Sequence, residues 1–141
     1  TGVAPFVSMI ASLIRDDAEA SDRTSGAAPG SLRAIVVHGV SHVDELAYRD
    51  RLERLAEGQM SVRYVPVVSR PTDPANAGWV GMTGRLDVAL KPICDMHGLE
   101  PASIIAFLCG NPEVIKAAAR ILAVHGLDPD AIVSEQYWPI A

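Results

Sequence analysis

The chain has 141 residues, the usual size of one domain, so it offers one hydrophobic core and little room for a second. Apolar residues make up 49% and charged residues 21%, the balance of a globular fold rather than a disordered chain. The 17 acidic residues exceed the 12 Lys and Arg and give a formal net charge of −5, which argues against a nucleic-acid partner.

Cysteine usage and hydropathy bear on the compartment. Cys94 and Cys109 are too few and too widely spaced for a disulfide framework or a four-ligand zinc site. This fits a reducing compartment, and we expect a cytoplasmic protein without a membrane span, since no apolar run approaches ~18 residues. The apolar residues 4–14 lack a positive leading segment, so they do not indicate a signal peptide. The chain opens on Thr1 rather than Met, and we interpret it as part of a longer protein.

The first half of the chain predicts a helix, a loop and a first strand–helix unit. Pro5 suits a first helical turn, and the apolar residues at positions 6, 7, 10, 13 and 14 recur at helical spacing. Residues 16–31 are polar and small and predict a surface loop. The apolar run 34–38 predicts a strand buried on both faces, and residues 43–57 predict a helix that Gly58 closes.

The second half continues the alternation. Residues 62–68 predict a strand that ends before Pro71, followed by a loop to Gly84. Residues 86–97 predict a helix that ends at Gly98, with an awkward interior Pro92 that could shift its start. Residues 104–109 predict a third strand, and residues 131–134 a last one. The helix between them begins at the N-cap Asn111, with Pro112 and Glu113 in its first turn, and ends before Gly126.

Strands that alternate with crossover helices predict an α/β fold with a mostly parallel sheet and helices on both faces. In such sheets, ligands bind beyond the carboxyl ends of the strands. Four segments should meet at that edge: the Thr1-Gly2 turn before the first helix, the Gly39-Val40-Ser41 and Ser69-Arg70 loops, and the Cys109-Gly110-Asn111-Pro112 turn.

These segments suit a nucleotide. Free N–H groups at the start of the Pro5 helix can hold a phosphate, and glycine allows the backbone to approach the ligand closely. The hydroxyl of Ser69 beside the guanidinium of Arg70 suits a phosphate monoester, because arginine can bind it with two hydrogen bonds.

Seven motifs in register resemble the pyridine-nucleotide domain of bacterial ferredoxin/flavodoxin–NADP reductases. The resemblance spans nearly the whole chain, apart from residues 16–31 and 139–141. The motifs are Thr1-Gly2-Val3-Ala4-Pro5-Phe6, His38-Gly39-Val40, Glu45-Leu46-Ala47-Tyr48, Val67-Val68-Ser69-Arg70, Gly84-Arg85-Leu86, Cys109-Gly110-Asn111-Pro112 and Glu135-Gln136-Tyr137-Trp138.

The resemblance implies that residues 1–141 are a Rossmann-like NADP-binding domain of a longer flavoprotein. In that family an FAD-binding β-barrel precedes this domain, and a strand ending in glycine comes just before the threonine. Both are missing here, so the sheet would lack its first, central strand. The implied full-length enzyme passes hydride between NADPH and FAD and exchanges single electrons with ferredoxin or flavodoxin; the isolated fragment would be inactive.

The resemblance also assigns residues. Thr1, Gly2 and Pro5 would line the pyrophosphate and nicotinamide end, whereas Ser69, Arg70 and Arg85 would hold the 2′-phosphate of NADP. Cys109 would face the reactive nicotinamide carbon with Glu135 nearby, Tyr137 would stack on the flavin ring, and Trp138 would cover another part of FAD. Relatives often have an arginine where this chain has Ser41, so NADP strictness could be weaker. The remaining expected cofactor contacts are His38, Gly39, Ser41, Gly110, Asn111 and Pro112.

Simpler interpretations stand beside these assignments. Cys109 alone is more often a small buried residue, His38 at a strand end is more often structural, and Tyr137-Trp138 could be a terminal clamp on the core. The histidines share no metal-ligand spacing, so no metal is expected. Arginines at 49, 51 and 54 could meet an acidic electron carrier, but a solvated helix face is the more common reason for such a row.

Two alternative functions also remain. The same fold serves NAD(P)H-dependent oxygenase reductases and flavin reductases. The chain could also be a nucleotide-binding module without turnover of its own.

Overall fold

The computed structural model describes residues 2–23 and 34–136. Helices and strands alternate along most of this part of the chain, as the sequence predicts. Their bounds are α1 (Ala4–Arg23), β1 (Ala34–Val40), α2 (Arg49–Ala56), β2 (Val62–Val68), β3 (Met82–Thr83), α3 (Leu86–Met96), β4 (Ala106–Gly110), α4 (Pro112–Val124) and β5 (Ile132–Gln136).

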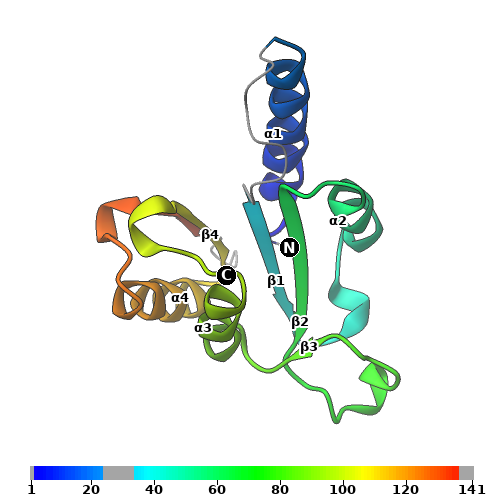
Figure 1. Cartoon of the computed structure of the whole chain (residues 1–141). Coiled ribbons are helices and arrows are strands. Elements are labelled where there is room, and N and C mark those ends of the chain that lie inside the picture. Colours follow the sequence, from blue (N-terminus) through cyan, green and yellow to red (C-terminus); the bar gives the residue numbers. More distant parts are fainter. Residues whose placement is uncertain (1, 24–33, 137–141) are drawn as a thin grey trace.

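The strands form two parallel sheets, one with the order β1-β2-β3 and one with β4-β5. The register of β1 against β2 is continuous from Ala34 opposite Val62 to Val40 opposite Val68. Figure 1 shows the two sheets as separate units, with α1 projecting beyond them. Parallel pairing brings the carboxyl ends of paired strands to the same edge, so the fold confirms the predicted α/β class.

Helices cover both faces of the β1–β2 pair. On one face, Val7 and Ile10 of α1 and Leu52 of α2 form a cluster with Val36 and Val62 of the strands. On the other face, Ala89 and Ile93 of α3 pack with Val67 and its partly buried neighbours. Alternate strand residues therefore face opposite helix layers, which is the doubly covered arrangement predicted from the apolar strand runs.

Helix α3 connects the two sheets. Its Ile93 belongs to the core of β1–β2, whereas the adjacent Cys94 packs with Leu122 of α4 and with apolar residues of β4 and β5. The opposite face of β4–β5 is less covered: Phe107 and Val133, which lie opposite each other in the register, are 47% and 50% exposed.

In the described part of the chain, β1 and β4 each lie at an edge of their sheet. Within residues 2–23 and 34–136, β1 pairs only with β2 and β4 only with β5, so each has one edge without a partner. A strand at the edge of a sheet presents backbone N–H and C=O groups that no neighbouring strand binds. One further parallel strand would therefore have a place beside β1 or β4.

Several predicted boundaries are wrong. Helix α1 continues through residues 16–23, where a loop was expected, because Asp, Ala and Glu there allow helix. The helix expected over 43–57 is divided into a 3-10 turn (η1, Val43–Glu45) and α2, since Tyr48 takes a positive φ of 61°. Pro92 lies inside α3 and does not shift its start.

The strand limits differ more modestly. β2 has the predicted bounds, but β1 runs on through Gly39 and Val40. β4 begins at Ala106 rather than 104, and β5 begins at Ile132, because Pro129–Ala131 form a 3-10 turn (η4). The expected loop up to Gly84 contains the 3-10 turn Pro74–Asn76 (η2) and the short strand β3. Among the described helices, none combines the length and apolarity that crossing a bilayer requires.

Candidate functional site

The loops after β1, β2 and β3 meet at one sheet edge. The amide of Ser69 donates to the carbonyl oxygen of Val40 at 2.9 Å, and the amide of Gly84 donates to that of Val68 at 3.0 Å. These bonds continue the strand ladders into the loops. The Ser69-Arg70 and Gly84-Arg85 segments therefore begin at neighbouring positions of this edge.

The beginning of α1 lies against the end of β4. A Cβ atom added to Gly2 would be 2.5 Å from the carbonyl oxygen and 2.8 Å from the carbonyl carbon of Cys109. No side chain fits in that space, so glycine is required for this close approach. Pro5 occupies the first turn of α1 as predicted. The turn before α1 and the turn after β4 thus form one continuous surface.

The turn after β4 leads directly into α4. Gly110 has a φ of 143°, which favours glycine. The Asn111 side chain caps α4 by accepting a hydrogen bond from the Glu113 amide at 2.8 Å, and Pro112 takes the first helical position. Cys109 is partly buried and lies opposite the exposed Glu135 in the β4–β5 register. The structure therefore brings Gly2, Cys109 and Glu135 into one neighbourhood.

The arginines of the site differ in their partners. Among the described residues, no hydrogen bond or ion pair engages the exposed Arg70 guanidinium, so its donors are available to a ligand. Arg85 is 73% exposed, and its Nε donates to Oδ1 of Asp87 at 3.1 Å. This bond to Arg85 is the main reason that the pKa of Asp87 lies below its ordinary value. Of the two arginines, only Arg85 has a hydrogen-bonded carboxylate partner among the described residues.

His38 is enclosed in the fold. Its side chain is 6% exposed, and its Nδ1 shares a hydrogen bond of 3.0 Å with the hydroxyl of Tyr64. Burial lowers the pKa of His38 to about 4 and raises the pKa of Tyr64 to about 12. Both groups are therefore neutral near pH 7, and the His38 ring supplies no charge to a phosphate.

A set of residues that the sequence analysis missed connects the loops after β1 and β2. Asn76, only 2% exposed, bonds to the backbone of both loops. Nearby, Nε2 of His42 lies 3.3 Å from Oδ2 of Asp73. The Asp73-Pro74 pair is a recognisable capping signal for a short turn, but nothing in the local sequence shows that Asn76 is buried.

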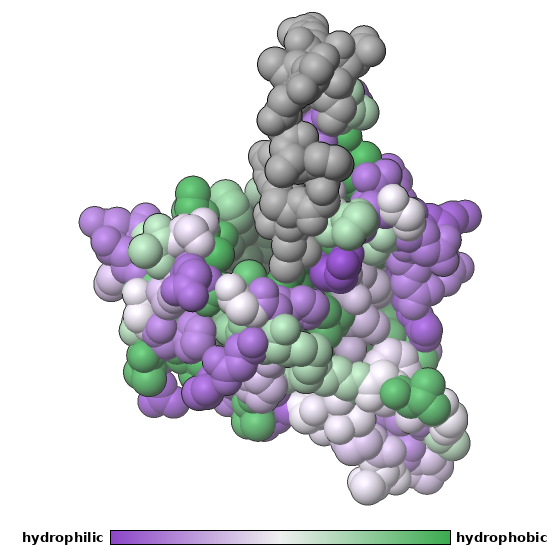
Figure 2. Space-filling model, in the orientation of Figure 1, coloured by the Kyte–Doolittle hydropathy of each residue, from purple (hydrophilic) through white to green (hydrophobic). Residues whose placement is uncertain are grey.

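Arginine residues of α2 lie mostly in solvent. Arg49 pairs with Glu53 at 2.7 Å and its guanidinium carbon lies 5.4 Å from the centre of the Trp79 ring. Arg51 and Arg54 are exposed. Figure 2 shows hydrophilic residues over this side of the molecule. A solvated helix face and a surface for an acidic electron carrier both require the exposure seen at Arg51 and Arg54.

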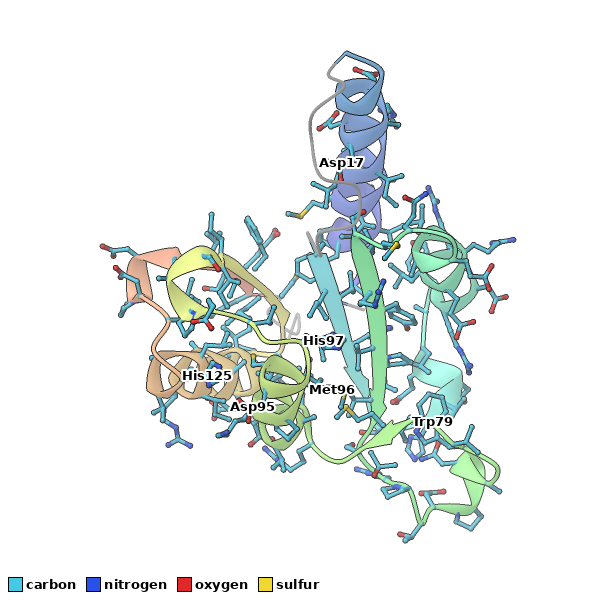
Figure 3. All side chains as sticks on the ribbon, in the orientation of Figure 1. Asp17, Trp79, Asp95, Met96, His97 and His125 are labelled. Carbon is cyan, nitrogen blue, oxygen red and sulfur yellow. The ribbon has the colours of Figure 1, made fainter. Side chains whose placement is uncertain are left out.

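The remaining histidines lie far from the loops described above. Figure 3 shows His97 and Asp95 near the end of α3 and His125 near the end of α4, away from Trp79. A shallow hollow lies between these helix ends, at the opposite end of α3 from Arg85. Within residues 2–23 and 34–136, no group of three or more His, Cys, Asp or Glu is arranged to hold a metal ion. Three predicted site residues, Thr1, Tyr137 and Trp138, lie outside the described residues.

This chain is similar to one known domain family and to several reductases. The family model of the oxidoreductase NAD-binding domain matches residues 1–120. The ferredoxin–NADP reductase of Azotobacter vinelandii is 27% identical over 139 residues, covering 90% of this chain and 47% of that protein. The reductase subunit of an aromatic O-demethylase from Amycolatopsis is 26% identical over 139 residues, covering 99% of this chain and 35% of that protein.

Solved structures share the fold. A ferredoxin–NADP reductase from Neisseria gonorrhoeae, crystallised with FAD and NADP bound, superposes with a TM-score of 0.59 at 31% identity. This match covers 74% of the present chain and 44% of that one. A cytochrome P450 reductase from Amycolatopsis gives a TM-score of 0.62 at 24% identity, with coverage of 76% and 29%.

The chain spans less than half the length of these relatives. The family model nevertheless covers most of the chain, at residues 1–120 of 141. The chain therefore belongs to the oxidoreductase NAD-binding domain family.

Proposed function

We propose that this chain binds NADP(H) across the carboxyl ends of its strands, within a flavoprotein that also carries an FAD-binding domain. The juxtaposition of Ser69-Arg70 with Gly84-Arg85 supports the proposal, since the exposed Arg70 guanidinium, which makes no hydrogen bond or ion pair among the described residues, follows the Ser69 hydroxyl directly in the chain. That pair fits the 2′-phosphate that distinguishes NADP from NAD. The solved Neisseria reductase, which holds FAD and NADP, supports the same pair of cofactors here.

The other end of the dinucleotide fits the surface formed by α1 and β4. The start of α1 presents backbone N–H groups to the pyrophosphate, and the missing Cβ of Gly2 leaves room beside the Cys109 carbonyl. The nicotinamide would then lie over Cys109 and near Glu135. These residues orient and enclose the ring, whereas bound FAD supplies the hydride and single-electron chemistry.

The whole protein, in this proposal, is a cytoplasmic ferredoxin–NADP reductase. A strand before Thr1 completes the sheet, and the described edges of β1 and β4 support this arrangement. Tyr137 stacks on the flavin, Trp138 covers another part of it, and ferredoxin or flavodoxin receives or delivers the electrons. An oxygenase reductase is the second candidate, favoured by the similarity to the demethylase reductase subunit.

Thiol alkylation tests where the nicotinamide binds. In the complete protein, iodoacetamide should modify Cys109 before Cys94, because Cys94 is 4% exposed and burial raises the pKa of its thiol. Saturating NADP⁺ should slow the alkylation of Cys109 by about fivefold or more, since a bound ligand covers its sulfur. Peptide mass spectrometry measures both rates, with Cys94 as the internal control. Equal rates for Cys109 with and without NADP⁺ would contradict the proposed site.

A further inference from the structure

Asn76 joins the loop after β1 to the loop after β2 from an enclosed position. Its Nδ2 donates to the carbonyl oxygens of Ser41 at 3.0 Å and of Arg70 at 2.7 Å, while its Oδ1 accepts from the Val43 amide at 2.8 Å. An asparagine amide has two N–H donors and one carbonyl oxygen, and all are used here. The reverse orientation of the amide would place its oxygen against two carbonyl oxygens, so the network fixes its direction.

A second connection joins the same two loops. Asp73 accepts a hydrogen bond from the Ala75 amide through Oδ1, at 2.9 Å, and its Oδ2 lies 3.3 Å from Nε2 of His42. On the other loop, Oε2 of Glu45 accepts from the amides of Ser41 and His42, both at 2.9 Å. The loop after β1 is thus fixed to its own 3-10 turn and to η2.

We propose that Asn76 is a positioning residue for NADP selectivity: by tying the Ser41 and Arg70 carbonyls to one amide, it holds these two loops at the separation that a 2′-phosphate requires. The inference rests on the proposed function. The Arg70 guanidinium makes no hydrogen bond or ion pair among the described residues and interacts with the Asp73 carboxylate only at longer range, so it is chiefly the Arg70 backbone that is anchored. Charge-assisted contacts depend on geometry, and fixing the backbone reduces the freedom that the side chain must lose on binding.

Selectivity, rather than binding in general, should depend on this connection. Both loops lie at the carboxyl ends of β1 and β2, whereas Gly2 and Cys109 are close together near the end of β4. The part of the dinucleotide common to NADP and NAD can therefore still bind to the β4 side. Loosening the two loops should weaken NADP⁺ and leave NAD⁺ almost unaffected.

The test uses Asn76→Asp in the complete flavoprotein. Aspartate has nearly the same shape and keeps an acceptor for the Val43 amide, but it loses both donors to the Ser41 and Arg70 carbonyls. It also adds a negative charge, whose repulsion of the 2′-phosphate would persist in the Arg70→Ala background tested below. We expect the Kd of NADP⁺ to rise about tenfold and that of NAD⁺ to change less than about twofold, because binding geometry is lost at one end only. Calorimetric titration with each nucleotide measures the two Kd values and hence their NADP⁺/NAD⁺ ratio. A lower melting temperature with an unchanged NADP⁺/NAD⁺ ratio would overturn the inference and leave Asn76 a purely structural residue.

A double variant separates this inference from the proposed function. When Arg70→Ala is already present, adding Asn76→Asp should cause little further change in the ratio of the NADP⁺ and NAD⁺ Kd values, because Asn76 acts through the Arg70 loop. Independent, additive effects would overturn the inference. If Arg70→Ala itself left the ratio unchanged, the proposed function would fail, and the inference with it.

A matched pair of capping variants covers the case in which Asn76→Asp does not fold. Asp73 and Asp128 cap equivalent Asp-Pro turns, each accepting a hydrogen bond at 2.9 Å from the residue two positions on, but only Asp73 contacts His42. Asp73→Ala should raise the Kd of NADP⁺ relative to that of NAD⁺ about threefold or more, and Asp128→Ala should leave this ratio of Kd values unchanged while losing a similar cap. If Asp73→Ala and Asp128→Ala changed the ratio of the NADP⁺ and NAD⁺ Kd values equally, the inference would be overturned.

Discussion

Replacing Arg70 with alanine in the complete protein is expected to reduce the preference for NADP⁺ over NAD⁺ by about tenfold or more. A charge-assisted hydrogen bond contributes roughly 1.5–3 kcal/mol, and each 1.4 kcal/mol or so corresponds to a factor of ten in binding. Arg70 is the arginine of the site whose guanidinium makes no hydrogen bond or ion pair among the described residues, whereas Arg85 is paired with Asp87. The measurement is kcat/KM with NADPH and with NADH.

Arg120→Ala is the matched control, because Arg120 is an exposed arginine in the later part of α4 and outside the site. It removes the same charge from the protein and should leave the ratio unchanged. If the Arg70 and Arg120 variants kept the same NADPH/NADH ratio as the unaltered protein, Arg70 would not hold the 2′-phosphate. At higher salt concentration, the NADPH/NADH preference of the unaltered protein should come closer to that of Arg70→Ala, since salt screens the interaction of the exposed Arg70 charge with the 2′-phosphate.

Gly2→Ala is expected to slow the reduction of bound FAD by NADPH by about tenfold or more. The added Cβ would lie 2.5 Å from the Cys109 carbonyl oxygen, a backbone atom that cannot turn away as a flexible side chain can. The start of α1 or the end of β4 must therefore move, and small displacements at a reacting centre can cost about a hundredfold in rate. Stopped-flow absorbance of the flavin measures the step.

Gly58→Ala tests whether this effect comes from crowding or from lost backbone freedom. Gly58 has a φ of 72°, but a Cβ there would meet no atom within 4 Å. Alanine should therefore destabilise the fold by about 1 kcal/mol through strain and leave the rate of flavin reduction unchanged. An unaltered rate in Gly2→Ala would mean that the surface between α1 and β4 does not position the nicotinamide.

Local chemistry made much of the fold predictable. The apolar run of β2 ends where Ser69, Arg70 and Pro71 begin, and its predicted bounds are those observed. Asn111 and Pro112 identify the start of α4 because a side-chain cap and a proline suit the same four free N–H groups. Gly98 and Gly126 follow helices with positive φ values, as C-terminal glycines often do.

Features that depend on distant contacts were not predictable. Tyr48 interrupts the expected helix through a positive φ that its sequence does not indicate. Asn76 stands between Ala75 and Ala77 in a segment rich in Pro, Gly and Ala, which predicts an exposed loop, yet its partner Ser41 is 35 positions away. Such a residue is recognised only when the two loops are brought together by strand pairing. That the loops after β1 and β2 are neighbours was predictable, because the ends of paired parallel strands lie at the same edge of a sheet.

A crystal structure of the complete protein with NADP⁺ tests the central claim most directly. We expect the 2′-phosphate within hydrogen-bonding distance of the Arg70 guanidinium and the nicotinamide ring over Cys109 and Gly110. A dinucleotide bound at another surface, or one whose 2′-phosphate lies in solvent away from Arg70, would contradict it.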